Sequence, residues 1–243
     1  MVLKLIFVLC IILEFIFVPL FLKAQWPGMC RKSLFYKMIC ATSFLTVGVI
    51  SAHLTDNKSV YAIIMLVGLC FGWLGDFFLH LKPTQRCFAI GFASFLVGHV
   101  FYLAAYIRTL PIIYKNYNLF NIYEIAVGAS IFAVGLILVK VFKVTFSSKL
   151  LKYSCVVYGS LLIGMFVKAS SLGLNYWLQG GEYGIIAFFV LSVGSLCFML
   201  SDASLGIIMF GGQKRNKPLK VFNIATYFAA QVLLASSLLF INV

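Results

Sequence analysis

Eight long apolar stretches constrain the fold of this chain more than any other feature. Each is close to the roughly 20 residues that an α-helix needs to cross the hydrocarbon core of a bilayer, and none alternates between polar and apolar residues as a β-barrel strand does. Hydrophobic residues make up 63% of the chain and charged residues only 10%. These features predict an all-α polytopic membrane protein, a bundle of eight transmembrane helices forming a single domain over residues 1–243. The predicted spans are 2–22, 35–53, 60–80, 88–108, 121–140, 152–170, 183–209 and 221–241.

The first stretch has the order of charges and apolar residues seen in a cleaved signal peptide. Lys4 precedes its apolar core, and Ala24 follows it. The core extends to Leu22, which is longer than a usual signal core, and Glu14 interrupts it. We therefore expect residues 2–22 to be retained as the first helix.

The positive charges predict the orientation of the chain in the membrane. Most of its 19 lysine and arginine residues follow the first, third, fifth and seventh spans or flank those loops. The positive-inside rule then assigns these loops to the cytoplasm and both termini to the non-cytoplasmic side. In this setting the net charge of +13 favours contact with anionic lipid head groups rather than with nucleic acid. The seven cysteines have no CxxC spacing, so we expect neither a disulfide framework nor a zinc site.

Two aspartates lie inside apolar spans in matching sequence contexts. Asp76 is part of Leu74-Gly75-Asp76-Phe77-Phe78-Leu79, and Asp202 is part of Leu200-Ser201-Asp202-Ala203-Ser204-Leu205. An Asp at the centre of a bilayer helix costs about 2.5–3.5 kcal/mol on insertion scales, so such residues usually have a function. Each Asp lies on the third helix of a four-helix half, which is consistent with a parallel 4+4 duplication. The structural alternative is that each Asp pairs with a neighbouring helix, for example through Lys37.

Other polar residues are predicted to converge on the depth of the two aspartates, in the cytoplasmic half of the bundle. They lie in the even-numbered spans, which run back from the cytoplasm. His80 falls at the end of its span, where a solvated histidine is expected, and the sequence has no HExxH or GxSxG motif. The converging residues are Lys37, His99, Tyr102, Tyr158, Tyr227 and Gln231.

Short motifs in a fixed order identify a resemblance. They are Gly75-Asp76, Gly98-His99-Val100-Phe101-Tyr102, Phe198-Met199-Leu200-Ser201-Asp202 and Thr226-Tyr227-Phe228-Ala229-Ala230-Gln231. This ordered set resembles the YhhN-like lysoplasmalogenases over nearly the whole chain. The resemblance implies an ether hydrolase that cleaves the vinyl ether of a lysophospholipid substrate to a fatty aldehyde and glycerophosphocholine or glycerophosphoethanolamine, without a cofactor. The seven cysteines and the loops favour the endoplasmic reticulum for a eukaryotic protein, and the inner membrane is expected for a bacterial one.

The residues suit this reaction, because vinyl ether cleavage needs a proton donor and a carboxylate that stabilises a cation. We expect Asp76 and Asp202 to share these two roles and His99 to move protons or orient one Asp. Tyr102, Tyr158, Tyr227 and Gln231 would position the substrate or water, and Lys37 would bind the phosphate. Two alternatives remain open: a proton- or cation-coupled transporter that uses the same acids, and a metal-dependent lipid hydrolase that uses the histidines and aspartates.

Overall fold

The computed structural model describes residues 2–26, 28–81 and 84–241, and within them the chain forms eight α-helices and no strand. All eight are long and apolar enough to cross a membrane, which confirms an all-helical, multi-pass integral membrane protein. The helices are α1 (Val2–Ala24), α2 (Arg31–Leu54), α3 (Val60–Leu81), α4 (Gln85–Ile113), α5 (Ile122–Val141), α6 (Lys149–Leu178), α7 (Gly184–Phe210) and α8 (Lys217–Ser236).

Short polar caps start several of these helices. The side chains of Thr84, Asn121, Ser148 and Asn216 each accept a hydrogen bond from a backbone N–H in the first turn of α4, α5, α6 and α8. Such a cap satisfies one of the donors that the first turn leaves unpaired. The caps extend α4, α6 and α8 by three or four residues beyond the predicted starts at 88, 152 and 221.

Three helix ends differ from the predicted ones by five residues or more, and the first is that of α4, which ends at Ile113 instead of near residue 108. Helix α6 continues past residue 170 to Leu178, and Lys168 within it forms an ion pair with Glu124 of α5. Helix α8 ends at Ser236 instead of near residue 241. It is followed by a 3₁₀ turn, Ser237–Leu239, in which the Ser237 hydroxyl bonds to the Leu234 carbonyl at 2.6 Å and to the Tyr61 hydroxyl at 2.8 Å.

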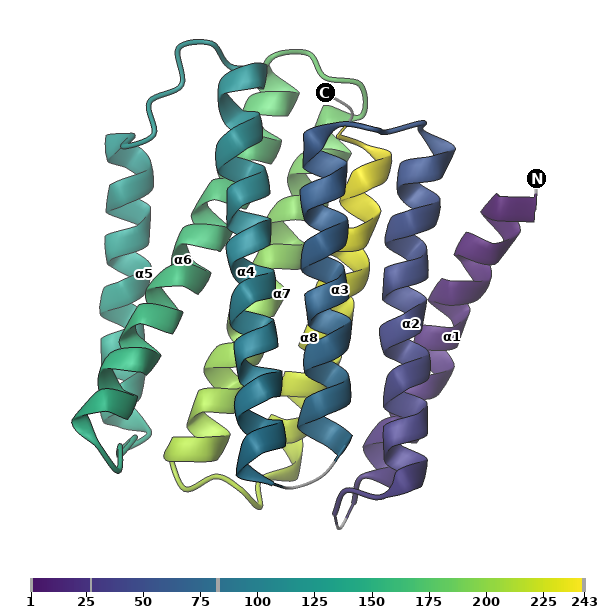
Figure 1. The fold of residues 1–243 in the computed structure, drawn as a ribbon. Helices are drawn as coiled ribbons and strands as arrows, with labels where there is room; N and C mark the ends of the chain where they lie inside the picture. Colours follow the sequence, from purple (N-terminus) through teal and green to yellow (C-terminus); the bar gives the residue numbers. More distant parts are fainter. Residues whose placement is uncertain (1, 27, 82–83, 242–243) are drawn as a thin grey trace.

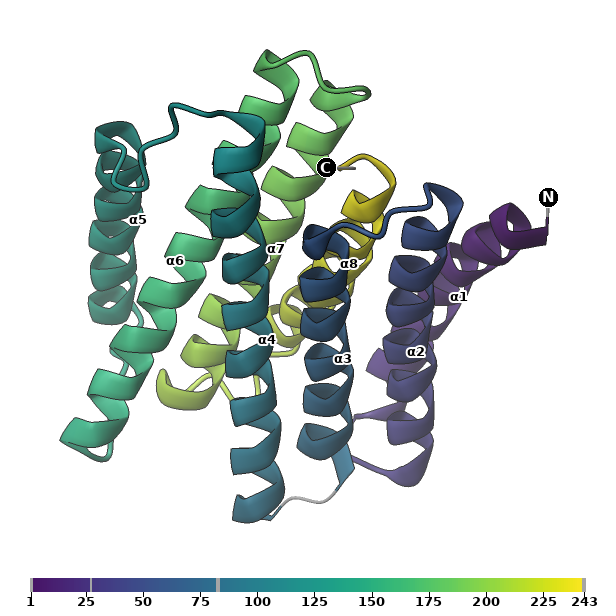
Figure 2. The same ribbon diagram turned by 45° about the horizontal axis from the view of Figure 1, so that its top comes forward.

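Six of the helices form a closed ring in which each packs against the next. The order around the ring is α2, α3, α4, α6, α7 and α8, and α8 packs against α2 again. Helices α1 and α5 lie outside the ring at opposite edges of the bundle (Figures 1 and 2). The start of α1 and the end of α8 lie at one end of the bundle (Figure 1). The loops between α1 and α2, α5 and α6, and α7 and α8 lie at the other, which we call the basic end (Figure 1).

The order of neighbours agrees with the expected relation between the two halves of the chain. When each helix of α1–α4 is exchanged with the helix at the same place in α5–α8, the α4–α6 contact becomes the α8–α2 contact. The order of helices around the ring stays the same. Helices α3 and α7, which carry the two aspartates, then occupy equivalent places. This is the arrangement that a parallel duplication predicts.

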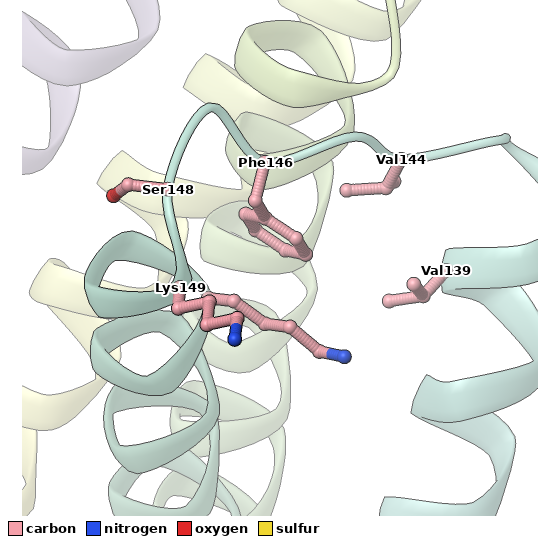
Figure 3. A pocket seen from close by; sticks show the side chains of 6 residues that line it. Val139, Val144, Phe146, Ser148 and Lys149 are labelled. Atoms are coloured by element: carbon pink, nitrogen blue, oxygen red, sulfur yellow. The ribbon is translucent and has the colours of Figure 1, made fainter.

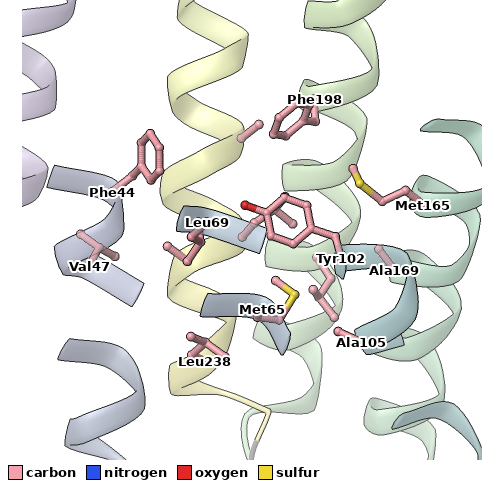
Figure 4. Packing of buried hydrophobic residues seen from close by; sticks show 14 of the residues in the cluster. Phe44, Val47, Met65, Leu69, Tyr102, Ala105, Met165, Ala169, Phe198 and Leu238 are labelled. Carbon is pink, nitrogen blue, oxygen red and sulfur yellow. The ribbon is translucent and has the colours of Figure 1, made fainter. Parts of the chain in front are cut away.

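The interior of the ring is filled by side chains from all six of its helices. Tyr102 lies near the centre, with Phe44 to one side, Met165 to the other, and Phe198 and Met65 above and below it in the view of Figure 4. The other labelled residues of this core are Val47, Leu69, Ala105, Ala169 and Leu238.

Glycines allow α3 and α4 to pack closely beside this core. A Cβ atom at Gly68 would lie 2.5 Å from the Tyr102 ring, and one at Gly98 would lie 3.1 Å from the Gly68 carbonyl oxygen. Small residues that let helix backbones approach are typical of membrane helix interfaces. The close packing holds His99 and Tyr102 of α4 near the aspartate-bearing helices.

Candidate active site

Asp76 is buried at the centre of one polar cluster, where two donors meet its carboxylate. Nζ of Lys37 on α2 lies 2.9 Å from Oδ1, and the hydroxyl of Tyr227 on α8 donates to Oδ2 at 2.7 Å. The Asp76 side chain is 1% exposed and that of Lys37 is 12% exposed. A buried carboxylate needs this combination of a countercharge and hydrogen bonds.

The Asp76 cluster continues through Gln231 to Tyr102. Nε2 of Gln231 donates to the Tyr227 hydroxyl oxygen at 3.1 Å, and the Tyr102 hydroxyl donates to Oε1 of Gln231 at 3.0 Å. Gly72 makes room for this amide, because a Cβ atom there would lie 2.7 Å from Nε2 of Gln231. Tyr102 donates to Gln231, Gln231 to Tyr227 and Tyr227 to Asp76. All three hydrogen bonds therefore point toward the Asp76 carboxylate, which accepts the last of them.

Asp202 forms a second cluster with Tyr158 and His99. The Tyr158 hydroxyl on α6 donates a short hydrogen bond to Oδ2 of Asp202, and Nε2 of His99 lies 3.8 Å from the same oxygen. Nδ1 of His99 lies 2.6 Å from the backbone carbonyl oxygen of Phe95. Because a carbonyl only accepts, Nδ1 must carry the hydrogen. In the neutral ring, Nε2 is then an unpaired acceptor that faces Asp202.

The two clusters occupy equivalent places in the two halves of the chain. Asp76 of α3 corresponds to Asp202 of α7, and the partner from the preceding helix is Lys37 in one cluster and Tyr158 in the other. The partner from the last helix of a half is Tyr227 for Asp76 and His99 for Asp202. Only the Asp76 cluster contains a lysine, so the same framework supplies two different electrostatic environments.

Phe198 of α7 lies between the two clusters. Its ring centroid is 4.6 Å from that of His99 and 5.6 Å from that of Tyr227. The structure thus brings all eight predicted residues into one layer of the bundle, in two adjoining groups. Within the described parts of the chain, no side chain is hydrogen-bonded to both aspartates. Phe198 was part of a sequence motif, but its chemistry offered no reason to predict a place between two acids.

The prediction that His80 is solvated was wrong. This side chain is 7% exposed, and its Nε2 lies 2.7 Å from the Ser33 hydroxyl. Phe21 of α1 packs edge-on against its ring, with 5.4 Å between ring centroids. These contacts from α1 and α2 remove His80 from the interface, which the position of His80 in the sequence did not reveal.

Glu14 is a buried acid for which the sequence predicted no role. Its side chain is 8% exposed, and apart from the Cys40 thiol, a weak partner, neither carboxyl oxygen has a hydrogen-bond partner among the described residues. Its position inside an apolar span was the sequence signal for burial.

The donor set does not suit a metal ion. Among the described residues, no group of three or more His, Cys, Asp and Glu side chains is arranged to hold one. His80 and His99 belong to different groups, one bonded to Ser33 and the other to Phe95.

Two surface cavities lie at the basic end of the bundle, away from the aspartates. One, of about 280 Å³, is formed where α5 joins α6 and is lined by Val139, Val144, Phe146, Ser148, Lys149 and Lys152 (Figure 3). The other, of about 330 Å³, lies between the end of α1 and the start of α8. None of the eight predicted site residues lines either cavity.

The model of the YhhN family matches residues 32–238, which includes both aspartate clusters and leaves out the whole of α1. No curated protein and no solved structure matches the chain.

Proposed function

Because this chain belongs to the YhhN family, we propose that it hydrolyses the vinyl ether bond of lysoplasmalogens. The products would be a fatty aldehyde and glycerophosphocholine or glycerophosphoethanolamine. The observation that carries the proposal is the pair of buried carboxyl groups in unlike surroundings, one beside a lysine and one beside a tyrosine and a histidine. Two acids in different environments are the arrangement that acid-catalysed hydrolysis uses.

The reaction begins with proton transfer to the outer carbon of the vinyl ether. This leaves an oxocarbenium ion, whose positive charge is centred on the carbon bonded to oxygen. Water adds to that carbon and loses a proton, and the resulting hemiacetal collapses to an aldehyde and an alcohol. The protein must supply one proton donor, one anion near the developing cation, and a path that returns the proton.

We assign the anion to Asp76. The ammonium group of Lys37 at 2.9 Å and the hydroxyl of Tyr227 at 2.7 Å both donate to its carboxyl oxygens, which favours the ionised form. Gln231 and Tyr102 would act as positioning residues. Gln231 hydrogen-bonds to Tyr227, and Tyr102 hydrogen-bonds to Gln231, so together they hold the Tyr227 hydroxyl against Asp76.

We assign the proton donor to Asp202. Tyr158 donates to Oδ2, so a proton on the carboxyl group would occupy the other oxygen and be free to leave. Nε2 of His99, an acceptor 3.8 Å from Oδ2, would take the proton from the attacking water and return it to Asp202.

Lys37 also retains the role of phosphate ligand in this proposal. Its ammonium group has three N–H donors, and the contact with Asp76 uses one of them. A phosphate group could then approach the remaining donors as a second anion.

Aldehyde release from an alkenyl lysophospholipid tests the proposed function, with the acyl lysophospholipid as the control substrate. The purified protein should release aldehyde only from the alkenyl substrate, in the presence or absence of a chelator. Asp76→Asn and Asp202→Asn should each fold and lose the activity. A wild-type protein that releases no aldehyde would contradict the proposal and favour a transporter that uses the same acids.

We further propose that both termini lie outside the cytoplasm and that the basic end faces it, as the distribution of positive charge favours. In a eukaryotic cell the endoplasmic reticulum is the proposed location. Topology reporters fused to each terminus test the orientation, and a cytoplasmic signal from either one would reverse it.

A further inference from the structure

The cavity between α1 and α8 gathers positive charge and aromatic surface at one place. Lys23 comes from the last turn of α1, and Lys217 and Lys220 come from the first turn of α8. The ammonium groups of Lys217 and Lys220 lie over the ring of Trp26, 4.4 and 5.1 Å from its centroid. Leu22, Gln25 and Val221 complete the lining.

These three lysines have no anionic partner within the protein. None of them forms a salt bridge or a side-chain hydrogen bond among the described residues, and a ring face leaves the N–H groups of an ammonium largely free to bind oxygen. Lys217 and Lys220 also lie at the start of α8, where the helix dipole adds positive potential. The cavity therefore lacks a counter-anion.

The acidic residues of the chain cannot supply that anion, because none lies at the surface of the basic end. Three of the six are inside membrane spans, and three lie toward the opposite end of the bundle (Figure 1). The first group is Glu14, Asp76 and Asp202, and the second is Asp56, Glu124 and Glu182. The anion must come from outside the chain.

The bilayer is the nearest source of anions for a cavity in this position. Trp26, which is 38% exposed, follows the end of a membrane-spanning helix, the depth at which tryptophan meets lipid head groups. The apolar side chains of Leu22 and Val221 continue from the lysines toward the hydrocarbon. Three positive charges without an acid favour a head group with a net negative charge over a zwitterionic one, whose own cation would be repelled.

We propose that the cavity formed by Lys23, Trp26, Lys217 and Lys220 binds the phosphate-containing head group of an anionic phospholipid. The phosphate oxygens accept hydrogen bonds from the lysines, and the chains of the lipid run along α1 and α8. The proposal does not depend on the hydrolase activity, since neither Asp76 nor Asp202 lines the cavity.

The cavity where α5 joins α6 provides a matched control within the same chain. It also has two lysines in the first turn of a membrane helix, Lys149 and Lys152, beside the aromatic ring of Phe146 (Figure 3). It lacks a lysine from a second helix, and neither of its lysines lies over a ring. Removing either pair of lysines changes the net charge equally and at the same end of the bundle.

Native mass spectrometry tests the site with the full-length protein, reconstituted in phosphatidylcholine nanodiscs that contain a minority of phosphatidylserine. The wild-type protein should retain one phosphatidylserine after extraction. At about 1 kcal/mol per lysine, Lys217→Gln with Lys220→Gln should weaken retention by about 30-fold, whereas Lys149→Gln with Lys152→Gln should leave it unchanged. Trp26→Leu, which keeps every charge, should weaken it several-fold.

Three outcomes would overturn the proposal. Equal loss in the two lysine double variants would show diffuse attraction rather than a site. Unchanged retention in Lys217→Gln with Lys220→Gln would exclude these lysines as ligands. Glycerophosphate, which has the phosphate but no chains, should compete only at much higher concentration. If it displaces the lipid at equal concentration, the site belongs to a soluble phosphate.

Discussion

Lys37 and Asp76 form a buried ion pair, with 2.9 Å between Nζ and Oδ1, in the membrane-spanning part of the bundle. Asp76 was predicted as a catalytic acid and Lys37 as a ligand of the substrate phosphate, and a pair between the two was the structural alternative that the sequence left open. The contact makes Lys37 the countercharge of Asp76 as well, so the lysine fixes the electrostatic environment of one aspartate and not of the other.

Replacing Lys37 with Met should destabilise the protein, because it leaves the Asp76 carboxylate buried without a countercharge. Breaking a buried pair in this way costs about 3 kcal/mol, whereas replacing both partners is close to neutral. The double variant Lys37→Met with Asp76→Asn should therefore recover most of the loss in an unfolding measurement in detergent. Lys58→Gln, which breaks the exposed pair with Asp56, is the control and should change stability by less than about 1 kcal/mol. A double variant as unstable as Lys37→Met would contradict the ion-pair argument.

Tyr158→Phe and Tyr227→Phe should each lower aldehyde release. Each change removes the hydroxyl that donates to one aspartate, and losing one preorganised donor costs about 100-fold in turnover. Tyr106→Phe is the control, since Tyr106 is fully buried but its hydroxyl has no hydrogen-bond partner among the described residues. Steady-state kinetics on the three variants make the comparison. A similar loss in Tyr106→Phe would mean that the effect comes from packing rather than from the aspartates.

Glu14→Met should raise stability by about 1–2 kcal/mol. The Glu14 carboxyl group is buried with only the Cys40 thiol as a weak partner, and burying an unsatisfied polar group costs this much in protein mutational data. Methionine has a similar length and no group that needs a partner. Turnover should stay near the wild-type value, as Glu14 is hydrogen-bonded to neither aspartate and lies outside the family match. A lower unfolding temperature in this variant would show that Glu14 has a stabilising partner.

Gly173→Ala should destabilise the contact between α6 and α7. A Cβ atom at Gly173 would lie 2.6 Å from Cα of Phe188 and 3.2 Å from the Ala187 carbonyl oxygen, and backbone atoms cannot move aside cheaply. Overpacking of this kind costs about 1–3 kcal/mol. Gly159→Ala on the same helix meets no atom within 4 Å and should gain up to about 1 kcal/mol from helix propensity. Thermal unfolding of the two variants should give shifts of opposite sign, and shifts of the same sign would rule out this explanation.

The sequence alone predicted the eight helices and the eight polar residues that the structure places in the two aspartate clusters. Eight spans follow from hydropathy, because a span must be apolar over its own length and the signal is local. Asp76 and Asp202 were identifiable as site residues since a carboxyl group is conspicuous in such a span. The depth of Tyr227 and Gln231 followed from counting residues along alternating helices.

The tertiary structure alone decided which residues meet. Lys37 contacts Asp76 and Tyr158 contacts Asp202 because α2 packs beside α3 and α6 beside α7 in a ring that closes between α8 and α2. His80 is buried because Phe21 of α1 and Ser33 of α2 pack against it. Hydropathy gives the depth of a residue but not the direction it faces or the neighbour of its helix, since the lipid-facing and ring-facing sides of these helices are both apolar. Packing between segments that are distant in the sequence determines which helices are neighbours. Those neighbours give Asp76 and Asp202 their different surroundings.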